Sequence, residues 1–388
     1  MPTDFHGLSP FGYSQRAVQW YNKMMLLRGG IHIFVFFDVG EAFDQDKLRS
    51  LIDPRGGPTK PDFPRRTPEY VRFENPPIVE PSEPLTLRSG ETVVCSIKYY
   101  EYAIVEVHLQ VPFEGTWEQL KAQTARWMDA PDVEPESRAV VIKHLQRTGG
   151  AIKNPREEWF QENYLAIDLE LMKDDEGNVV SADQILTSFG EQIGQLLRGE
   201  EARLAKATND RILQGSLSYY STDLLVVGFN AALVYDRPEE SARAIQILEY
   251  ARVQLLEFRY YDNFMTRVLA DVYNSLDRKT NVLLSRWSLP REANRLNTIR
   301  LDVMELTERI DNAVKFVSDS YYALVYRTAA NRAGVPEYRA LVEQKLNTAR
   351  ELYDFMMAQF NEARLFLLEA AITILCLLDV IALFRGGK

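Results

Sequence analysis

The chain has 388 residues, 46% hydrophobic and 26% charged, with a formal net charge of −10. This composition is typical of a folded protein and excludes wholesale disorder, and the length predicts two or three domains. A dominant nucleic-acid surface needs clustered Lys and Arg. The acidic balance and the absence of a dense basic run therefore argue against broad nucleic-acid binding and leave room only for a small local patch.

The chemistry-bearing residues form no known signature. Two cysteines, Cys95 and Cys376, lie far apart, which argues against a disulfide scaffold and fits a reducing compartment. The four histidines and two cysteines show no zinc-ligand spacing, and no phosphate-binding loop, serine-hydrolase elbow or H-E-x-x-H motif occurs. We therefore predict no catalytic residue, no metal site and no cofactor, and we favour a non-enzymatic protein.

The first two-thirds of the chain mixes strand and helix signals. Ile31–Gly40 is an apolar, β-branched run that predicts a buried strand, and Asp44 is a candidate N-cap for a short helix ending at Ile52. The Pro- and Gly-rich residues Asp53–Tyr70 predict a loop. Alternation over Glu91–Phe113 predicts one or two strands.

Further elements follow in the same region. The patterns predict helices at Gly115–Met128 (capped by Thr116), Glu134–Arg147 and Ser181–Gly199, a strand at Glu162–Met172, and a strand or hairpin at Asp223–Asp236 broken near Gly228. After an N-terminal segment (1–30), we therefore expect an α+β head over residues 31–236, built as one sheet with helices on one face.

Strand signals stop at Arg237, and residues 237–364 are predicted to be helical. Ser241–Leu276 is amphipathic. Two apolar seams follow with alternating three- and four-residue steps: Val303, Leu306, Ile310, Ala313, Val317, Ser320 and Leu324, then Val342, Leu346, Ala349, Tyr353, Met356, Phe360, Ala363 and Leu367. Gly334 and Pro336 mark a turn between them. The seams predict a long antiparallel, coiled-coil-like helical hairpin and homo-oligomerisation.

Leu365–Phe384 is almost wholly apolar and continues the second seam helix without a breaker. Its 20 residues match the ~30 Å hydrocarbon thickness of a bilayer. A helix that is hydrophobic all round lies either in a membrane or deep in a protein core, so the alternative is the buried core of an oligomer. We favour a transmembrane helix that contacts the lipid bilayer, giving a single-pass, tail-anchored protein.

Two acidic residues, Glu369 and Asp379, interrupt this stretch. An acid at a span's centre costs about 3 kcal/mol, but these lie toward its two ends, where they cost less. We expect them to face a neighbouring helix or the headgroup region. The N-terminus has no apolar stretch of signal-peptide length, so the head is expected in the cytoplasm, or in the mitochondrial matrix for an organellar protein.

Candidate interaction residues lie around the start of the helical region. Glu257, Arg259, Tyr261 and Asp262 form either a polar cluster facing a cleft or a helix face whose charges pair or meet water. Asn230 is either a ligand-binding residue or, as we favour, a turn residue. His108, in an alternating strand, is expected to be an ordinary core or surface histidine.

Three stretches resemble the RMD/YagE-like family, named for a requirement in meiotic nuclear division. They are the early strand and helix (Ile31–Ile52), the segment Ser221–Asp236 running into Ile247–Asp262, and the helical hairpin with its apolar tail. The resemblance implies a membrane-anchored, non-enzymatic protein, with mitochondrial members linked to organelle translation at the inner membrane. It implies no site residues, because the family has no established site motif.

These observations predict a membrane-anchored scaffold or adaptor whose head recruits an unknown protein partner. An alternative is an enzyme whose head binds a small ligand near Tyr219–Asp262. A channel subunit similar to the CorA magnesium channels is a third hypothesis, although the G-M-N signature of that family is absent and only one span is visible.

Overall fold

The computed structural model describes residues 26–52, 77–173, 177–277, 289–314 and 321–385. These form two compact units. The first contains the described residues up to Glu257 together with those of Val314–Val335, and the second contains those of Phe258–Ala313 and Pro336–Lys388.

The first unit is built on a mixed sheet that is nine-stranded over the described residues, in the order β3-β5-β6-β1-β8-β11-β10-β9 with β4 beside β5. Its strands are β1 (Leu27–Asp38), β3 (Ile78–Pro81), β4 (Leu85–Thr86), β5 (Thr92–Tyr99), β6 (Ile104–Gly115), β8 (Phe160–Leu169), β9 (Ser216–Leu217), β10 (Leu224–Val227) and β11 (Ala231–Tyr235). Neighbours pair antiparallel except β8 and β11, which run parallel. Short strands β2 (Ala42–Phe43) and β7 (Ile152–Lys153) form a separate pair.

One face of this sheet carries the main apolar core. Alternate residues of β1, among them Ile33 and Val35, pack in one cluster with Leu120, Val141 and Ile193. Among the residues described between β2 and β10, the first unit contains five helices, namely α2 (Gln45–Leu51), α3 (Trp117–Met128), α4 (Val133–Thr148), α5 (Ala182–Arg198) and α6 (Lys206–Leu213), together with the short 3-10 helix η1 (Gly149–Ala151).

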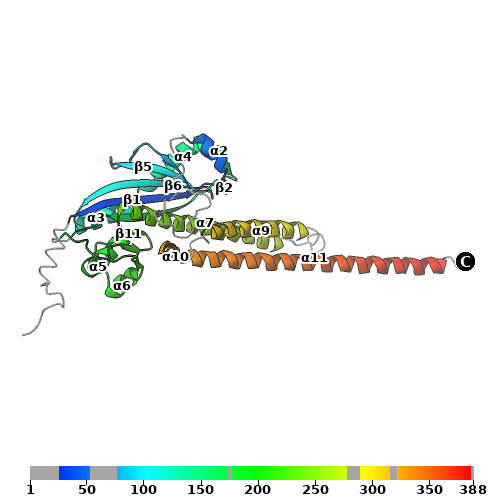
Figure 1. Cartoon of the computed structure of the whole chain (residues 1–388). Helices are drawn as coiled ribbons and strands as arrows, with labels where there is room; N and C mark the ends of the chain where they lie inside the picture. The colour runs from blue at the N-terminus through cyan, green and yellow to red at the C-terminus, as the bar shows by residue number, and fades with distance from the viewer. Residues whose placement is uncertain (1–25, 53–76, 174–176, 278–288, 315–320, 386–388) are drawn as a thin grey trace, which may run out of the picture. The chain divides into compact units, whose positions relative to one another are not determined.

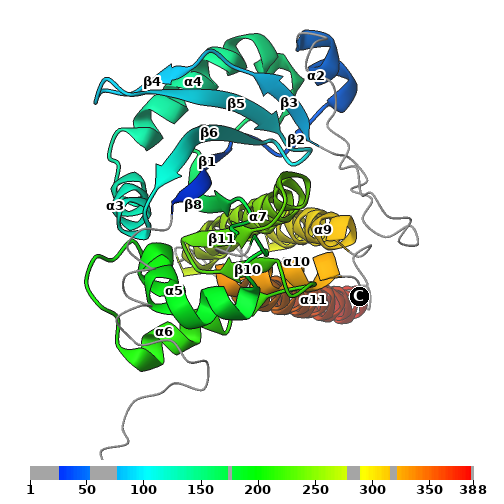
Figure 2. The same ribbon diagram turned by 60° about the vertical axis from the view of Figure 1, so that its left-hand side comes forward.

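The opposite face of the sheet is covered by the first half of α7 (Pro238–Asp277). Lys98 of β5 pairs with Glu249 of α7, and the Arg252 guanidinium lies 3.9 Å from the ring centroid of Tyr164 on β8. Figure 2 shows α4 and α7 on opposite sides of the sheet. The helices within residues 31–236 share one core with one face of the sheet, as expected, and the other face is covered by a helix that begins beyond that region. From Ala251 to Phe258 every residue of α7 is buried, which a purely amphipathic pattern does not require.

The sequence signals for local structure were largely confirmed. Asp44 caps α2 by accepting a hydrogen bond from Lys47 N at 3.1 Å, and Thr116 forms a capping box with Gln119 at the start of α3. Asp223–Asp236 is the hairpin alternative, with β10 and β11 separated at Gly228. The loop predicted at Asp53–Tyr70 lies outside the described residues.

The remaining helices are α9 (Leu289–Val314), α10 (Tyr321–Ala333) and α11 (Val335–Arg385). Gly334, at φ +86°, separates α10 from α11, as predicted for the turn. Val317 and Ser320 of the first seam lie outside the described residues, and Leu324 falls on α10 with 45% exposure. The antiparallel hairpin remains a prediction.

Helix α11 changes character along its length. Val342, Ala349, Met356 and Ala363 are buried at a seven-residue interval, so the predicted seam is the covered face of this helix. From Arg364 to Ala382 the side chains are nearly all exposed. Within the second unit, Figure 1 shows this last part of α11 extending past α9.

Candidate functional site

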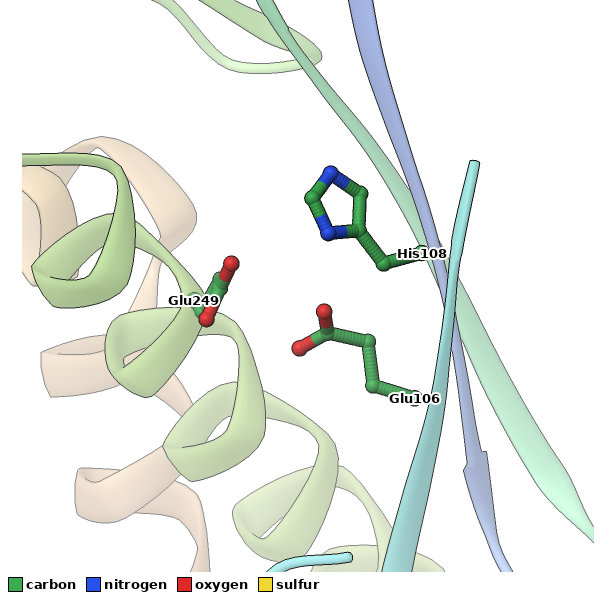
Figure 3. A group of neighbouring side chains, drawn as sticks. All are labelled: Glu106, His108 and Glu249. Carbon is green, nitrogen blue, oxygen red and sulfur yellow. The ribbon is translucent and has the colours of Figure 1, made fainter. Parts of the chain in front are cut away.

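A buried polar cluster lies between the sheet and α7, and it consists of Lys98, Tyr100, Glu106, His108 and Glu249. The strands place it by simple alternation, because residues two apart on a strand share a face. Glu106 and His108 lie on β6, and Lys98 is the register partner of Glu106 on β5. Glu249 reaches them from α7 (Figure 3).

Lys98 and Tyr100 bind both carboxylates of this cluster. The Lys98 Nζ lies 2.5 Å from Glu249 Oε1 and 3.2 Å from Glu106 Oε1. The Tyr100 hydroxyl lies 2.6 Å from Glu106 Oε2 and 3.2 Å from Glu249 Oε2. The Glu106 and Glu249 side chains are 0% and 1% exposed, so both carboxylates are removed from water.

Two histidines adjoin the carboxylates. His32 Nδ1 lies 2.9 Å from His108 Nε2, within hydrogen-bonding distance. Since Nε2 of His108 faces His32, its Nδ1 is the nitrogen left to face the carboxylates, and Figure 3 shows a ring nitrogen turned toward Glu106 and Glu249. Phe34 packs on the His108 ring at a centroid distance of 4.7 Å.

Burial and the neighbouring charges shift the pKa values of the groups in this cluster. Burial, with repulsion from Glu249, raises the pKa of Glu106 to about 7, against the opposing effect of Lys98. Burial alone would lower the pKa of Lys98, but Glu106 and Glu249 outweigh it and raise that pKa. Burial and the charge of Lys98 lower the pKa of His32 to about 4, and the same causes together with His32 lower the pKa of His108 well below its ordinary value. Both imidazoles are therefore neutral at pH 7.

This arrangement can bind a cation or relay a proton. One potential ligand atom each from Glu106, His108 and Glu249 lies within 4.8 Å of the other two. The sequence patterns predicted no metal site, and of the cluster residues they drew attention only to His108, as an ordinary core or surface histidine. The spacing Glu106-x-His108 was visible in the sequence, but Glu249 joins it from 141 residues farther along the chain, beyond any local motif.

The predicted site residues are divided between the two units. Asn230 is exposed in the β10–β11 turn, where its carbonyl accepts a hydrogen bond from Leu165 N at 3.1 Å. Glu257 is buried at the end of the first unit, whereas Arg259, Tyr261 and Asp262 belong to the second. In that unit Tyr261 is buried, Arg259 is half-buried, and Asp262 is an ion-pair partner of Lys345 on α11. Glu369 and Asp379 are both exposed on α11.

One further buried charge supports the first unit. Arg252, 2% exposed, contacts Glu162 Oε1 at 3.3 Å and donates a hydrogen bond to the Phe229 carbonyl at 2.5 Å. It also stacks over the Tyr164 ring. These contacts join α7 to β8 and to the β10–β11 turn.

Comparison with known proteins gives a family but no activity. The chain is 23% identical over 187 residues to the uncharacterized protein MJ0711 of Methanocaldococcus jannaschii, covering 48% of this chain and 57% of that protein. No solved structure matches the chain. The RMD/YagE-like family is not the one whose model matches, and that resemblance stays a prediction. The model for "Uncharacterized protein MJ0711, N-terminal domain" matches residues 28–242, more than half of the chain, which therefore belongs to this family.

Proposed function

We propose that this protein is a membrane-anchored scaffold or adaptor, held in a bilayer by the last part of α11. The observation that carries this proposal is the exposure of the apolar stretch. Within the described residues, α11 is the one helix long and apolar enough to cross a membrane, with a mean hydropathy of 2.4 in a window that is 0% buried.

The free energy of transfer of the apolar side chains favours lipid over water around this stretch. Large side chains are exposed along it, including Leu365 at 60%, Phe366 at 61% and Leu375 at 62%. Monomeric soluble proteins rarely expose so large a contiguous apolar surface. Leu, Ile, Phe and Val each contribute about −0.3 to −0.6 kcal/mol to membrane insertion at a helix centre, which offsets two off-centre acids. The alternative occupant of this surface is a second copy of the chain.

Two features support the scaffold role: the first unit has no catalytic signature in its sequence, and the chain resembles the RMD/YagE-like family. The family's matched region carries no known catalytic signature, and the RMD/YagE-like resemblance implies a non-enzymatic protein at a membrane. In this proposal the head recruits a partner protein. The seams of α9 and α11 form an antiparallel pair and contribute to self-association.

Membrane fractionation of full-length protein tests the anchor. The full chain should remain in the membrane pellet after alkaline carbonate extraction and move to the detergent phase. Deletion of Leu365–Lys388 should release it into the supernatant. If the truncated chain stays in the pellet, the anchor is elsewhere. If the full chain extracts as a soluble oligomer that the deletion converts to monomers, the stretch is an oligomer core.

A further inference from the structure

Glu106, His108 and Glu249 form a group of potential metal ligands inside the polar cluster. Their potential ligand atoms lie within 4.8 Å of one another, a spacing that a single ion could bridge after small side-chain rotations. Figure 3 shows all three side chains directed into the same space between β6 and α7. The strand and helix backbones that carry them belong to one compact unit.

We propose that these three side chains bind one divalent transition-metal ion of the zinc class, and that Lys98 is the built-in competitor that occupies the site when the ion is absent. Zinc accepts imidazole nitrogen and carboxylate oxygen at about 2.0–2.2 Å, and three protein ligands leave a position open for water or another ligand. Magnesium and calcium prefer oxygen-only sets with more ligands, so this donor set disfavours both.

The charge of the cluster supports a cation. Lys98 faces two carboxylates that are 0% and 1% exposed, which leaves one net negative charge when all three groups are ionised. Glu106 Oε1 has Lys98 as an ion-pair neighbour at 3.2 Å, yet among the described residues no partner reaches it with hydrogen-bond geometry. When Glu106 carries no proton, this extra buried negative charge is costly, and a divalent ion would supply the missing positive charge.

The second coordination layer is also present. Metal-bound histidines usually engage a further group through the ring nitrogen that does not bind the metal, which fixes the orientation of the ring. His108 Nε2 lies 2.9 Å from His32 Nδ1, so His108 is already held with Nδ1 toward the carboxylates. Tyr100 performs the same function for Glu106, through its hydroxyl at 2.6 Å from Oε2.

Lys98 can leave without unfolding the site. Its side chain is 15% exposed, and a lysine stem is flexible enough to carry the ammonium group to water. Binding of the ion would then exchange an ammonium for a divalent ion against the same oxygens. This competition gives a signature that a purely structural ion pair lacks, because removing Lys98 should strengthen metal binding.

The test uses the full chain in detergent micelles, stripped with a chelator and free of any polyhistidine tag. Isothermal titration with Zn²⁺ should give one site per chain, and Co²⁺ should produce visible absorption bands of a low-coordinate site. Glu106→Gln, Glu249→Gln and His108→Ala should each weaken binding by about 10–100-fold or more, the range seen even for second-layer residues. Lys98→Met should strengthen it by about tenfold or more, because it removes the competing charge.

Glu80→Gln is the matched control, because Glu80 is another buried carboxylate beside a histidine, with His144 Nδ1 at 3.3 Å. It should leave the zinc affinity unchanged. Zinc should also raise the melting temperature of wild type and of Lys98→Met but not of Glu249→Gln, with circular dichroism verifying that each variant is folded. Absence of one-site binding in both wild type and Lys98→Met would overturn the proposal. So would binding that Glu106→Gln and Glu249→Gln leave intact.

Discussion

Lys98 and Glu249, 151 residues apart in the chain, meet at 2.5 Å where β5 faces α7. The Glu249 side chain is 1% exposed and the Lys98 side chain 15%, so the carboxylate is almost fully removed from water and the lysine is partly accessible. Removing one member of such a pair lowers the free energy of unfolding more than replacing both members by apolar residues does. The reason is that a single remaining charge stays buried without its partner.

We expect Glu249→Leu to lower the free energy of unfolding by about 3 kcal/mol, since Lys98 then keeps only Glu106 as a counter-charge. The double variant Lys98→Met/Glu249→Leu should recover most of that loss. Urea denaturation followed by tryptophan fluorescence measures both, because Trp117, Trp127 and Trp159 lie in the first unit. Simple additivity of the two single changes would contradict the coupling.

Acid stability should depend on Glu80. Burial would raise the pKa of Glu80, but hydrogen bonds from His144, Arg147 and Tyr99 outweigh it and lower the pKa to about 2. A carboxyl group whose pKa is lower in the folded state stabilises the fold above its unfolded pKa of about 4.5, and loses that contribution as the pH falls toward 2. Glu80→Gln should therefore be less stable than wild type by about 2–3 kcal/mol at pH 7.

The gap between wild type and Glu80→Gln should shrink as the pH falls from 4.5 to 2, as measured by urea denaturation at each pH. Glu83→Gln is the control, because its partner Lys143 and Glu83 are 69% and 85% exposed. Exposed pairs of this kind contribute little, so this change should leave stability almost unaltered. A gap for Glu80→Gln that stays constant down to pH 2 would be inconsistent with the expectation.

Arg252 should be among the most sensitive charged residues of the first unit. Arg252→Met removes the Glu162 contact, the bond to the Phe229 carbonyl and the stacking on Tyr164, so we expect a loss of about 2–4 kcal/mol. Arg252→Lys should recover only part of it, because an ammonium group cannot reach a carboxylate and a carbonyl as a planar fork does. Thermal melting compares them with Arg203→Met, whose arginine is 80% exposed and should tolerate the change.

If α11 spans a bilayer, one charge at the centre of the stretch should impair insertion. Ile374→Arg places an arginine midway between Leu365 and Phe384, at a cost of about 3 kcal/mol, or roughly a hundredfold in the insertion equilibrium. Glu362→Arg, just before the stretch, is the matched control and should insert like wild type. The membrane fraction after carbonate extraction measures both, and equal retention of the two variants would argue for a protein core.

The acids of the stretch give a separate expectation. The double variant Glu369→Leu/Asp379→Leu should stay in the membrane, because it removes two unfavourable groups. If these acids face a neighbouring copy of α11, as intramembrane acids commonly face a bundle interior, the double change should reduce the oligomer size in detergent. Unaltered self-association would place them against lipid headgroups.

Local chemistry made much of the fold predictable. The caps at Asp44 and Thr116, the hairpin break at Gly228 and the change of pattern at Leu365 depend on neighbours within a few residues. What α7 covers could not be predicted, because its burial comes from strands and from α10, most of them distant in the sequence. The same limit hid the polar cluster, since Lys98, Glu106 and Glu249 acquire their chemistry only by meeting.

The polar cluster has a consequence for how the sheet assembles. Strand β1 pairs with β6 and β8 along almost its whole length, and His32 alternates with Ile31 and Ile33 between two buried faces. A slip of one residue during folding would turn His32, Glu106 or Lys98 into the apolar core, away from the polar groups that it contacts in the native structure. Misaligned pairings would thereby be penalised at several positions at once, so the cluster should favour the native register of the strands.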